Sequence, residues 1–155
     1  MLKSMSKLIY VLSAAAVTLM AADPSLGRWK LNVDKSQYSP GPAPKSGVTT
    51  ITKDGDWIIV KNDGVDAEGK KVAGRIRLKR DGKEHPYETP DGHRGTMSSK
   101  IIDDNHYETV IKLDGGGETT MSVVISPDGK TRTQTVKGVN AKGETVNNVV
   151  VLERQ

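Results

Sequence analysis

Histidine, serine and acidic residues are the side chains of this chain that could carry chemistry, because its 155 residues include no cysteine. Without cysteine there is no disulfide or thiolate chemistry, and a metal ion would depend on histidines and carboxylates. The three histidines, His85, His93 and His106, do not have the spacing of a short chelating motif. We therefore predict that they lie exposed at turns and strand ends, and we expect no metal site.

The serines and acidic residues give no catalytic signature either. No serine lies in the Gly-x-Ser-x-Gly pattern of a nucleophile elbow, and none has a local signature that pairs it with a histidine. The run Asp103-Asp104-Asn105 lacks the spacing and the closing glutamate of a calcium loop, so we interpret it as a turn. The run Gly115-Gly116-Gly117 precedes a predicted strand and offers no helix N-terminus for a phosphate. The sequence predicts neither an enzyme nor a cofactor site.

A stripe of cations is the first candidate for binding. Arg75, Arg77 and Lys79 alternate with Ile76 and Leu78, so on a strand the cations share one face and the aliphatic side chains the other. If the cations point inward, they form a cradle for a carboxylate or phosphate group; if they point outward, they are a solvated face. The aliphatic residues make the better lining, which favours the outward orientation. Arg77 is kept as the candidate contact for an anionic ligand end.

Three aromatic residues are the other candidates. Tyr107 shares a predicted strand face with Thr109, Ile111 and Leu113, which suggests an inward side chain. Trp57 begins a run that is apolar on both faces, so its direction is open, and Tyr87 follows a proline near a strand end, where a barrel mouth would lie. Core packing remains the alternative role for each. The candidate ligand-binding residues are Trp57, Tyr87, Tyr107 and Arg77.

These residues lie on short strands. After Asp23 no apolar spacing of three and four residues is sustained over three turns, so no helix is predicted. Runs rich in Val, Ile and Thr alternate with Asp-Gly, Asn-containing and Gly-rich turns. The proline-rich segment Tyr38–Pro44 is predicted to cross an end of the fold or to lie along an edge. About ten strands are predicted, each paired with its neighbour: 28–33, 47–53, 57–62, 72–79, 84–87, 96–102, 106–113, 119–125, 131–137 and 146–154.

The predicted fold class is all-β, an antiparallel up-and-down β-barrel of about ten strands, because closure removes the exposed edges of the sheet. A two-sheet sandwich would satisfy the same pattern. One pattern, Gly-Val-(Asp/Asn)-Ala-x-Gly-x-x-Val, occurs twice, at Gly64–Val72 and at Gly138–Val146. We interpret it as one hairpin turn used twice, with two equivalent ligand loops as the alternative.

The first 22 residues have the three parts of a secretory signal: basic Lys3 and Lys7, an apolar stretch from Leu8 to Met20, and a small-residue end at Ala21-Ala22. The alternative is a retained N-terminal anchor helix. We expect cleavage, a single domain over 23–155, no membrane span in the mature protein, and a periplasmic or secreted location in a bacterium.

The net charge gives no support for a nucleic-acid partner. The whole chain carries a formal charge of +4, but Lys3 and Lys7 lie in the predicted signal. Without these two lysines the chain has 21 basic and 19 acidic residues. A net charge of +2 is too small to argue for a polyanion. We expect a monomer.

The stretch from Gly27 to Pro44 has the pattern Gly-x-Trp-Lys-Leu-Asn-x-x-Lys-Ser-x-Tyr-x-Pro-Gly-Pro-x-Pro. A Gly-x-Trp on the first strand, after a signal and before a series of antiparallel strands, resembles the lipocalin and calycin superfamily. The longer stretch is similar to a group of uncharacterised exported bacterial lipocalin-like proteins, whose turn and tail also match Gly64–Gly69 and Val146–Val149. The resemblance covers most of the chain after Asp23.

In lipocalins the first-strand tryptophan packs at the closed end of the barrel, and a cation from the last strand lies across its indole. The resemblance therefore implies structural roles for Gly27, Trp29 and Arg154, the last as a cation–π partner of Trp29. The other two lipocalin sequence blocks are not visible, no helix follows the barrel, and there are no disulfides. The resemblance supports the barrel topology more than any ligand.

Two functions follow as hypotheses. The first is non-covalent binding of a small amphipathic or polar ligand inside the barrel, with Trp57, Tyr87 and Tyr107 lining it and Arg77 meeting an anionic end. The alternative is a cell-envelope protein that acts through its outer surface and binds no small molecule.

Overall fold

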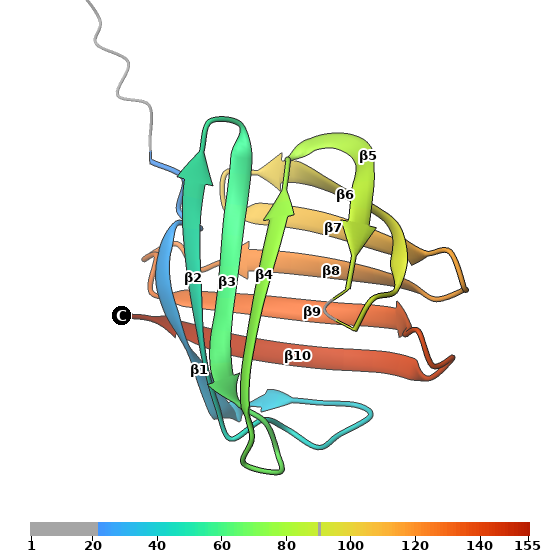
Figure 1. The fold of residues 1–155 in the computed structure, drawn as a ribbon. Helices are drawn as coiled ribbons and strands as arrows, with labels where there is room; N and C mark the ends of the chain where they lie inside the picture. The colour runs from blue at the N-terminus through green and yellow to red at the C-terminus, as the bar shows by residue number, and fades with distance from the viewer. Residues whose placement is uncertain (1–21, 90) are drawn as a thin grey trace, which may run out of the picture.

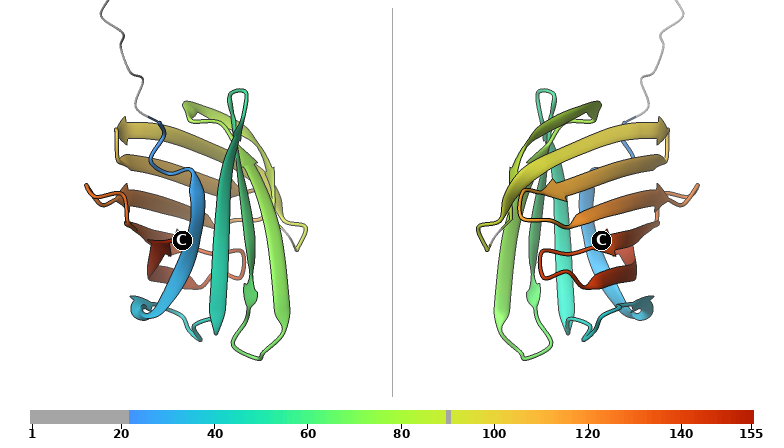
Figure 2. Two further views of the ribbon diagram at one scale, coloured as in Figure 1. Left: turned by 90° about the vertical axis from the view of Figure 1, so that its left-hand side faces the viewer. Right: turned by 90° about the vertical axis from the view of Figure 1, so that its right-hand side faces the viewer.

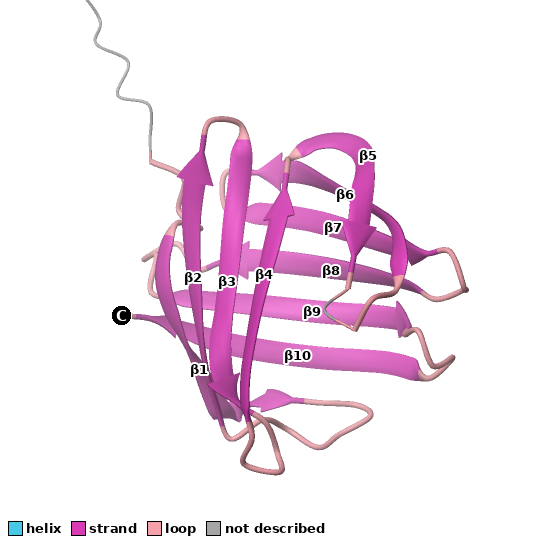
Figure 3. Cartoon of the chain, viewed as in Figure 1, coloured by secondary structure: helices cyan, strands magenta, loops and turns pink. Residues whose placement is uncertain are grey.

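The computed structural model describes residues 22–89 and 91–155, which form ten antiparallel strands and, among these residues, no helix (Figures 1 and 3). The predicted all-β fold class is confirmed. Within the described ranges, no helix has the length and apolar character needed to cross a membrane. The predicted signal lies outside the described residues apart from Ala22. The strands are β1 (Gly27–Gln37), β2 (Ser46–Asp54), β3 (Trp57–Val65), β4 (Lys71–Leu78), β5 (Asp81–Glu88), β6 (Arg94–Asp103), β7 (His106–Leu113), β8 (Glu118–Ile125), β9 (Thr131–Val139) and β10 (Thr145–Arg154).

The strands follow one another around a nearly closed barrel in the order β4-β3-β2-β1-β10-β9-β8-β7-β6-β5. The first and last strands pair directly, with Trp29 opposite Arg154 and Leu31 opposite Leu152. Figure 2 shows β2–β4 as one wall, with the strands of the β6–β10 wall crossing it at a large angle.

The barrel is interrupted between β4 and β5, which follow each other in sequence but do not pair. The prediction that every strand pairs with its neighbour is wrong here. Asp81 already belongs to β5 and pairs with Lys100 of β6, so Asp81-Gly82 does not form a hairpin turn back onto β4. The register of β5 then shifts between Asp81 and Glu84.

The repeated sequence pattern forms two equivalent hairpin turns. In the first, the amide of Asp66 donates to Lys70 O, and in the second the amide of Asn140 donates to Glu144 O. The side chains of Asp66 and Asn140 accept further backbone amides within the same turns. These turns join β3 to β4 and β9 to β10. One turn chemistry is used twice because both loops must reverse an antiparallel pair over the same length.

The apolar core fills one end of the barrel, called the closed end below. It consists of inward side chains that alternate with outward ones along each strand, as a half-buried sheet requires. Five partly buried residues on the same inner surface, Val60, Ile76, Ile111, Met121 and Val150, extend it toward the other, open end. The buried core residues are Trp29, Ile51, Ile58, Leu78, Met97, Tyr107, Val123, Ile125 and Leu152.

The proline-rich segment lies at the open end and is tied to β10. The amide of Ser39 donates to the side-chain oxygen of Asn148 at 2.8 Å, and the amide of Asn147 donates to Ser39 O at 2.7 Å. The segment therefore crosses an end of the fold, one of the two positions expected from its prolines.

Candidate ligand-binding site

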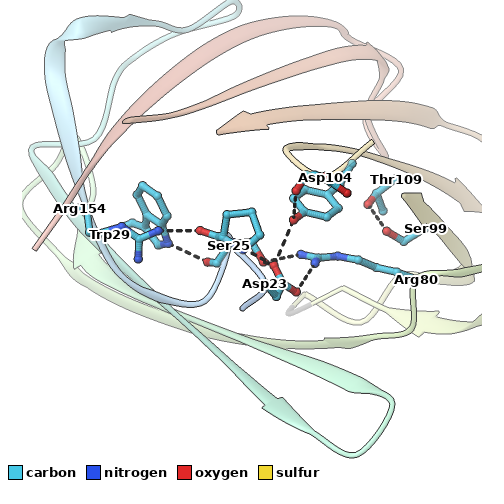
Figure 4. A network of polar contacts seen from close by, with 10 residues as sticks. Asp23, Ser25, Trp29, Arg80, Ser99, Asp104, Thr109 and Arg154 are labelled. Carbon is cyan, nitrogen blue, oxygen red and sulfur yellow. Dashed lines mark hydrogen bonds and ion pairs between the residues drawn. The ribbon is translucent and has the colours of Figure 1, made fainter. Parts of the chain in front are cut away.

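The closed end is covered by the segment that precedes β1, residues 22–26, which we call the cap (Figure 4). Asp23 accepts hydrogen bonds from the amide and hydroxyl of Ser25 at 2.9 and 2.6 Å and forms an ion pair with Arg80 at 2.7 Å. Burial alone would raise the pKa of Asp23, but the Ser25 hydrogen bonds and the Arg80 charge lower it overall. Asp23 is therefore ionised at neutral pH, and Arg80 has its counter-charge inside the protein.

The aromatic side chains below this cap are fixed by cations. The guanidinium of Arg154 lies 4.2 Å from the centroid of the Trp29 ring and donates to Pro24 O and Leu26 O, while the Trp29 indole N–H donates to Ser25 O at 2.9 Å. This is the contact between Trp29 and Arg154 that the lipocalin resemblance implied. Gly27 has a φ of 119°, which other residues rarely adopt, and a Cβ there would also displace the end of the Arg154 side chain.

Tyr107 points inward, as expected, but toward the closed end. Its single hydroxyl hydrogen is shared between Asp23 Oδ1 at 3.1 Å and Asp104 O at 3.2 Å, and the guanidinium of Arg80 lies 3.7 Å from its ring centroid. Burial and the Asp23 charge raise the pKa of Tyr107 to about 12. Tyr107 therefore belongs to the core and to the cap, and its hydroxyl is occupied.

A second arginine inside the barrel has no such counter-charge. Arg132 lies on the inner face of β9, paired with Ile125 of β8 and Leu152 of β10, and it is 7% exposed. One terminal nitrogen donates to Gln134 Oε1 at 2.8 Å, whereas the buried Nε has no hydrogen-bond partner. Among the described residues no carboxylate forms an ion pair with Arg132.

Desolvation, followed by repulsion from Arg80, lowers the pKa of Arg132 to about 10. The side chain is still a cation at neutral pH, so the protein holds a buried positive charge without a counter-charge. Such a charge costs several kcal/mol unless a counter-charge or hydrogen bonds compensate it. No sequence pattern marks Arg132 as a candidate site residue.

The surface around Arg132 is mixed in polarity. Arg132 is hydrogen-bonded to Gln134, the next inward residue of β9. Polar inner side chains elsewhere bond one another: Thr109 donates to Ser99 at 2.9 Å and Thr49 donates to Asn62 at 2.8 Å (the first pair in Figure 4). Partly buried aliphatic side chains lie between these polar groups. The interior therefore offers apolar walls, satisfied polar pairs, and one unsatisfied cation.

A hollow of about 320 Å³ lies at the open end, near the low limit of volumes that hold small ligands. It lies where the β5–β6, β7–β8 and β9–β10 connections meet, so the second copy of the repeated turn contributes to it. Burial and the Asp91 charge raise the pKa of Tyr87, which keeps its hydroxyl protonated. The lining residues are Tyr87, Thr89, Asp91, Ile111, Leu113, Gly117, Thr119, Val139, Asn140 and Ala141.

Trp57 and Arg77 lie elsewhere. Ile58 of β3 belongs to the core, so its neighbour Trp57 faces the other side of the strand, and Arg77 is paired with Ile59 on that same outer side. The guanidinium of Arg77 lies 4.0 Å from the centroid of the Trp57 ring and Lys79 Nζ lies 4.8 Å from it. The cationic stripe has the outward orientation that its aliphatic neighbours favoured. Of the four candidate ligand contacts, Tyr87 lines the hollow and Tyr107 reaches the core.

The histidines are distributed around the barrel. His85 lies beside Asp81, His93 beside Asp91, and His106 hydrogen-bonds Ser122 at 2.8 Å. Over residues 22–89 and 91–155, no group of three or more His, Cys, Asp or Glu side chains is placed to hold a metal ion.

Comparisons of the whole fold identify the class of structure. A protein from Schistosoma mansoni described as a fatty acid binding protein in complex with arachidonic acid is 18% identical, covers 86% of this chain and 99% of its own, and superposes with a TM-score of 0.62. The zebrafish ileal bile acid-binding protein complexed with cholic acid is 16% identical. The match covers 85% of this chain and 98% of the zebrafish protein, with a TM-score of 0.52. As-p18, described as an extracellular fatty acid binding protein, is 14% identical. The match covers 86% of this chain and 97% of As-p18, with a TM-score of 0.53.

At these identities the likeness shows the fold alone. The chain has a ten-stranded antiparallel barrel with the fold of these fatty-acid-binding and bile-acid-binding proteins. Scans against profiles of protein families and against curated proteins find no match.

Proposed function

We propose that the protein binds a small amphipathic anion, with a carboxylate as its headgroup, non-covalently inside the barrel. The observation that carries the proposal is Arg132, a buried cation whose Nε has no partner and which has no carboxylate beside it. A ligand carboxylate would supply the counter-charge and accept a charge-assisted hydrogen bond from the guanidinium. The anion contact predicted for Arg77 is thereby assigned to a different arginine, on the inner side of the barrel.

The interior suits the rest of such a ligand. Val60, Ile76 and Val150 are inner-surface side chains that are only partly buried, so apolar surface remains for a ligand body to cover. Covering apolar surface contributes about 25 cal/mol per Å² before the costs of association. The ligand would enter at the open end, where Tyr87 and Ile111 line the hollow.

The structural neighbours support the same chemical class. Arachidonic acid and cholic acid, the ligands in two of their descriptions, are both amphipathic carboxylic acids. We propose binding without catalysis, because the inner hydroxyls of Ser99 and Thr109 are bonded to each other and not to a base. The signal-like N-terminus supports an exported, periplasmic or secreted, binding protein.

A matched pair of probes tests the headgroup. Binding of 11-(dansylamino)undecanoic acid and of its uncharged methyl ester would be measured by fluorescence titration on the wild-type chain and on Arg132→Met. We expect the wild type to prefer the acid by about tenfold or more, since a hydrogen bond to a charged group contributes roughly 1.5–3 kcal/mol. The variant is expected to bind acid and ester alike.

Arg77→Met serves as the control, because Arg77 lies on the outer side, against Trp57. This variant should keep the wild-type preference for the acid. Equal affinity of the wild type for acid and ester would overturn the carboxylate assignment. Absence of binding of either probe, in protein shown to be folded by circular dichroism, would count against the barrel as a binding site and favour a protein that acts through its outer surface.

A further inference from the structure

The outer surface of β1–β4 carries more positive than negative charge. Strand pairing places Arg75 of β4 opposite Lys61 of β3, Lys61 opposite Thr50 of β2, and Thr50 opposite Arg28 of β1. Three cations therefore lie in one row across four strands, a span of roughly 14 Å at the usual strand spacing. All three side chains are exposed.

The charge in this row works against the stability of the sheet. Like charges directly opposite each other on one face of an antiparallel pair are destabilising, and Arg75 and Lys61 are such a pair. On β3 and β4, which the structure describes throughout, the outer side has one carboxylate, Asp63, and that residue is opposite Ala73. Asp63 forms no ion pair within the described part of the chain.

Further cations extend the row along the same side. Arg77 and Lys79 cover the Trp57 ring, and Lys71 lies on the same outer face. Lys30 lies there too, opposite Val48 on β2 and opposite Glu153 on β10. We call this surface the basic face and define it by the residues Arg28, Lys30, Lys61, Lys71, Arg75, Arg77 and Lys79.

The opposite wall of the barrel is different. Three of its outer cations are paired with carboxylates: Lys100 with Glu108 at 2.9 Å, Lys112 with Glu84 at 3.2 Å, and Arg94 with Glu88 at 3.4 Å. The small net charge of the chain therefore hides an asymmetry, since, of the residues that the structure describes, more of the cations without an ion pair lie on the β1–β4 wall than on the opposite one. An asymmetric field of this kind attracts an anionic partner to one side of the molecule.

We propose that the basic face binds the surface of a membrane that contains anionic lipids. The face is the outside of a barrel wall and presents a broad array of cations to a surface, with each Lys or Arg near an anionic bilayer contributing about 1 kcal/mol. Its aromatic ring, Trp57, is already covered by Arg77 and Lys79, so it offers no stacking platform for nucleic-acid bases. A membrane is also where amphipathic molecules partition, although the surface argument does not depend on the proposed ligand.

Vesicle sedimentation tests the proposal. Wild-type protein would be mixed with vesicles of phosphatidylcholine alone and with vesicles containing 30% phosphatidylglycerol. Two variants with the same net charge would be compared: Lys61→Ser/Arg75→Ser on the basic face, and Lys130→Ser/Lys137→Ser on the exposed β8–β9 turn and the outer side of β9. Each pair removes two positive charges.

We expect the wild type to bind the anionic vesicles and not the neutral ones, and to be released as salt shortens the range of the attraction. The basic-face variant should lose affinity about tenfold or more, and the control variant less than about threefold. Equal losses in both variants would mean that net charge alone governs binding and would overturn the basic face. Failure of the wild type to bind anionic vesicles, or tighter binding to an oligonucleotide than to them, would overturn the membrane as the partner. Arg132→Met should bind vesicles like the wild type, which separates this result from that of the proposed ligand site.

Discussion

The two interior arginines differ in what surrounds them, and stability should report the difference. Arg80 is paired with Asp23 and stacks on Tyr107, whereas Arg132 has neither a carboxylate nor a partner for Nε. Removing one member of a buried ion pair leaves the other charge uncompensated, while replacing an unpaired buried charge by an apolar side chain is often neutral or stabilising.

We therefore expect Arg80→Met to lower the free energy of unfolding by about 2 kcal/mol, because Asp23 loses its counter-charge and Tyr107 its stacking partner. Arg132→Met should leave the free energy of unfolding of the ligand-free protein unchanged, or raise it by about 1 kcal/mol. Urea denaturation of the wild type and the two variants measures both. If Arg132→Met were as destabilising as Arg80→Met, Arg132 would have a structural role and the argument for a ligand anion would fail.

At the scale of single strands, the glycines that begin the two repeated turns have a packing role. A side chain at Gly138 would collide with the carbonyl oxygen of Glu118 on β8, and its φ of 138° is unfavourable for other residues. A side chain at Gly64 would approach the carbonyl oxygen of Ser46 on β2 to 2.5 Å. The strands at these points are closer together than any residue with a Cβ would permit.

Gly138→Ala is thus expected to lower the free energy of unfolding by about 2 kcal/mol, since both the backbone conformation and the neighbouring strand must shift. Gly115→Ala is the matched control, because a Cβ there meets nothing within 4 Å and its φ is not in the unfavourable range. That substitution should change stability by less than about 0.5 kcal/mol. Thermal denaturation of the two variants compares them directly, and equal stabilities would show that the collision is relieved without cost.

Local signals predicted the strands well and the interior poorly. The strand predicted from alternation and turn residues at His106–Leu113 has the same bounds as β7. The predicted ends of the other strands differ from the observed ends by at most three residues, except in β1, which continues to Gln37. Arg132 was missed because β9 alternates Thr131, Thr133 and Thr135 with Arg132, Gln134 and Val136. Threonine suits either face of a strand, so the pattern does not say which set points inward. The direction of Trp57 was open for the same kind of reason, because its strand is apolar on both faces.

The interruption between β4 and β5 is a property of the whole barrel that no local pattern predicted. Asp81-Gly82 has the composition of a hairpin turn. The pairing of Asp81 with Lys100 shows instead that the chain continues into β5, which pairs with β6. Arg80 lies at this junction and forms an ion pair with Asp23, which lies near the N-terminal end of the described chain. The contact that fixes the junction is thus long-range, and sequence proximity carries no information about it.

The whole-molecule consequence is a difference in local stability around the barrel. β4 pairs only with β3 and β5 only with β6, while each of the other strands has a paired neighbour on both sides. Backbone amides with a paired strand on one side open more readily than those held from both sides.

Hydrogen–deuterium exchange followed by mass spectrometry should therefore find the fastest strand exchange in Lys71–Leu78 and Asp81–Glu88, about tenfold or more above that in Thr131–Val139. The end of β4 next to Arg80 should be the better protected part, because the Asp23–Arg80 ion pair holds the junction at 2.7 Å. Arg80→Met would then raise exchange at Asp81–Glu88 without raising it at Thr131–Val139. Uniform exchange across all ten strands would mean that the interruption does not weaken the barrel and that β4 and β5 are held by other contacts.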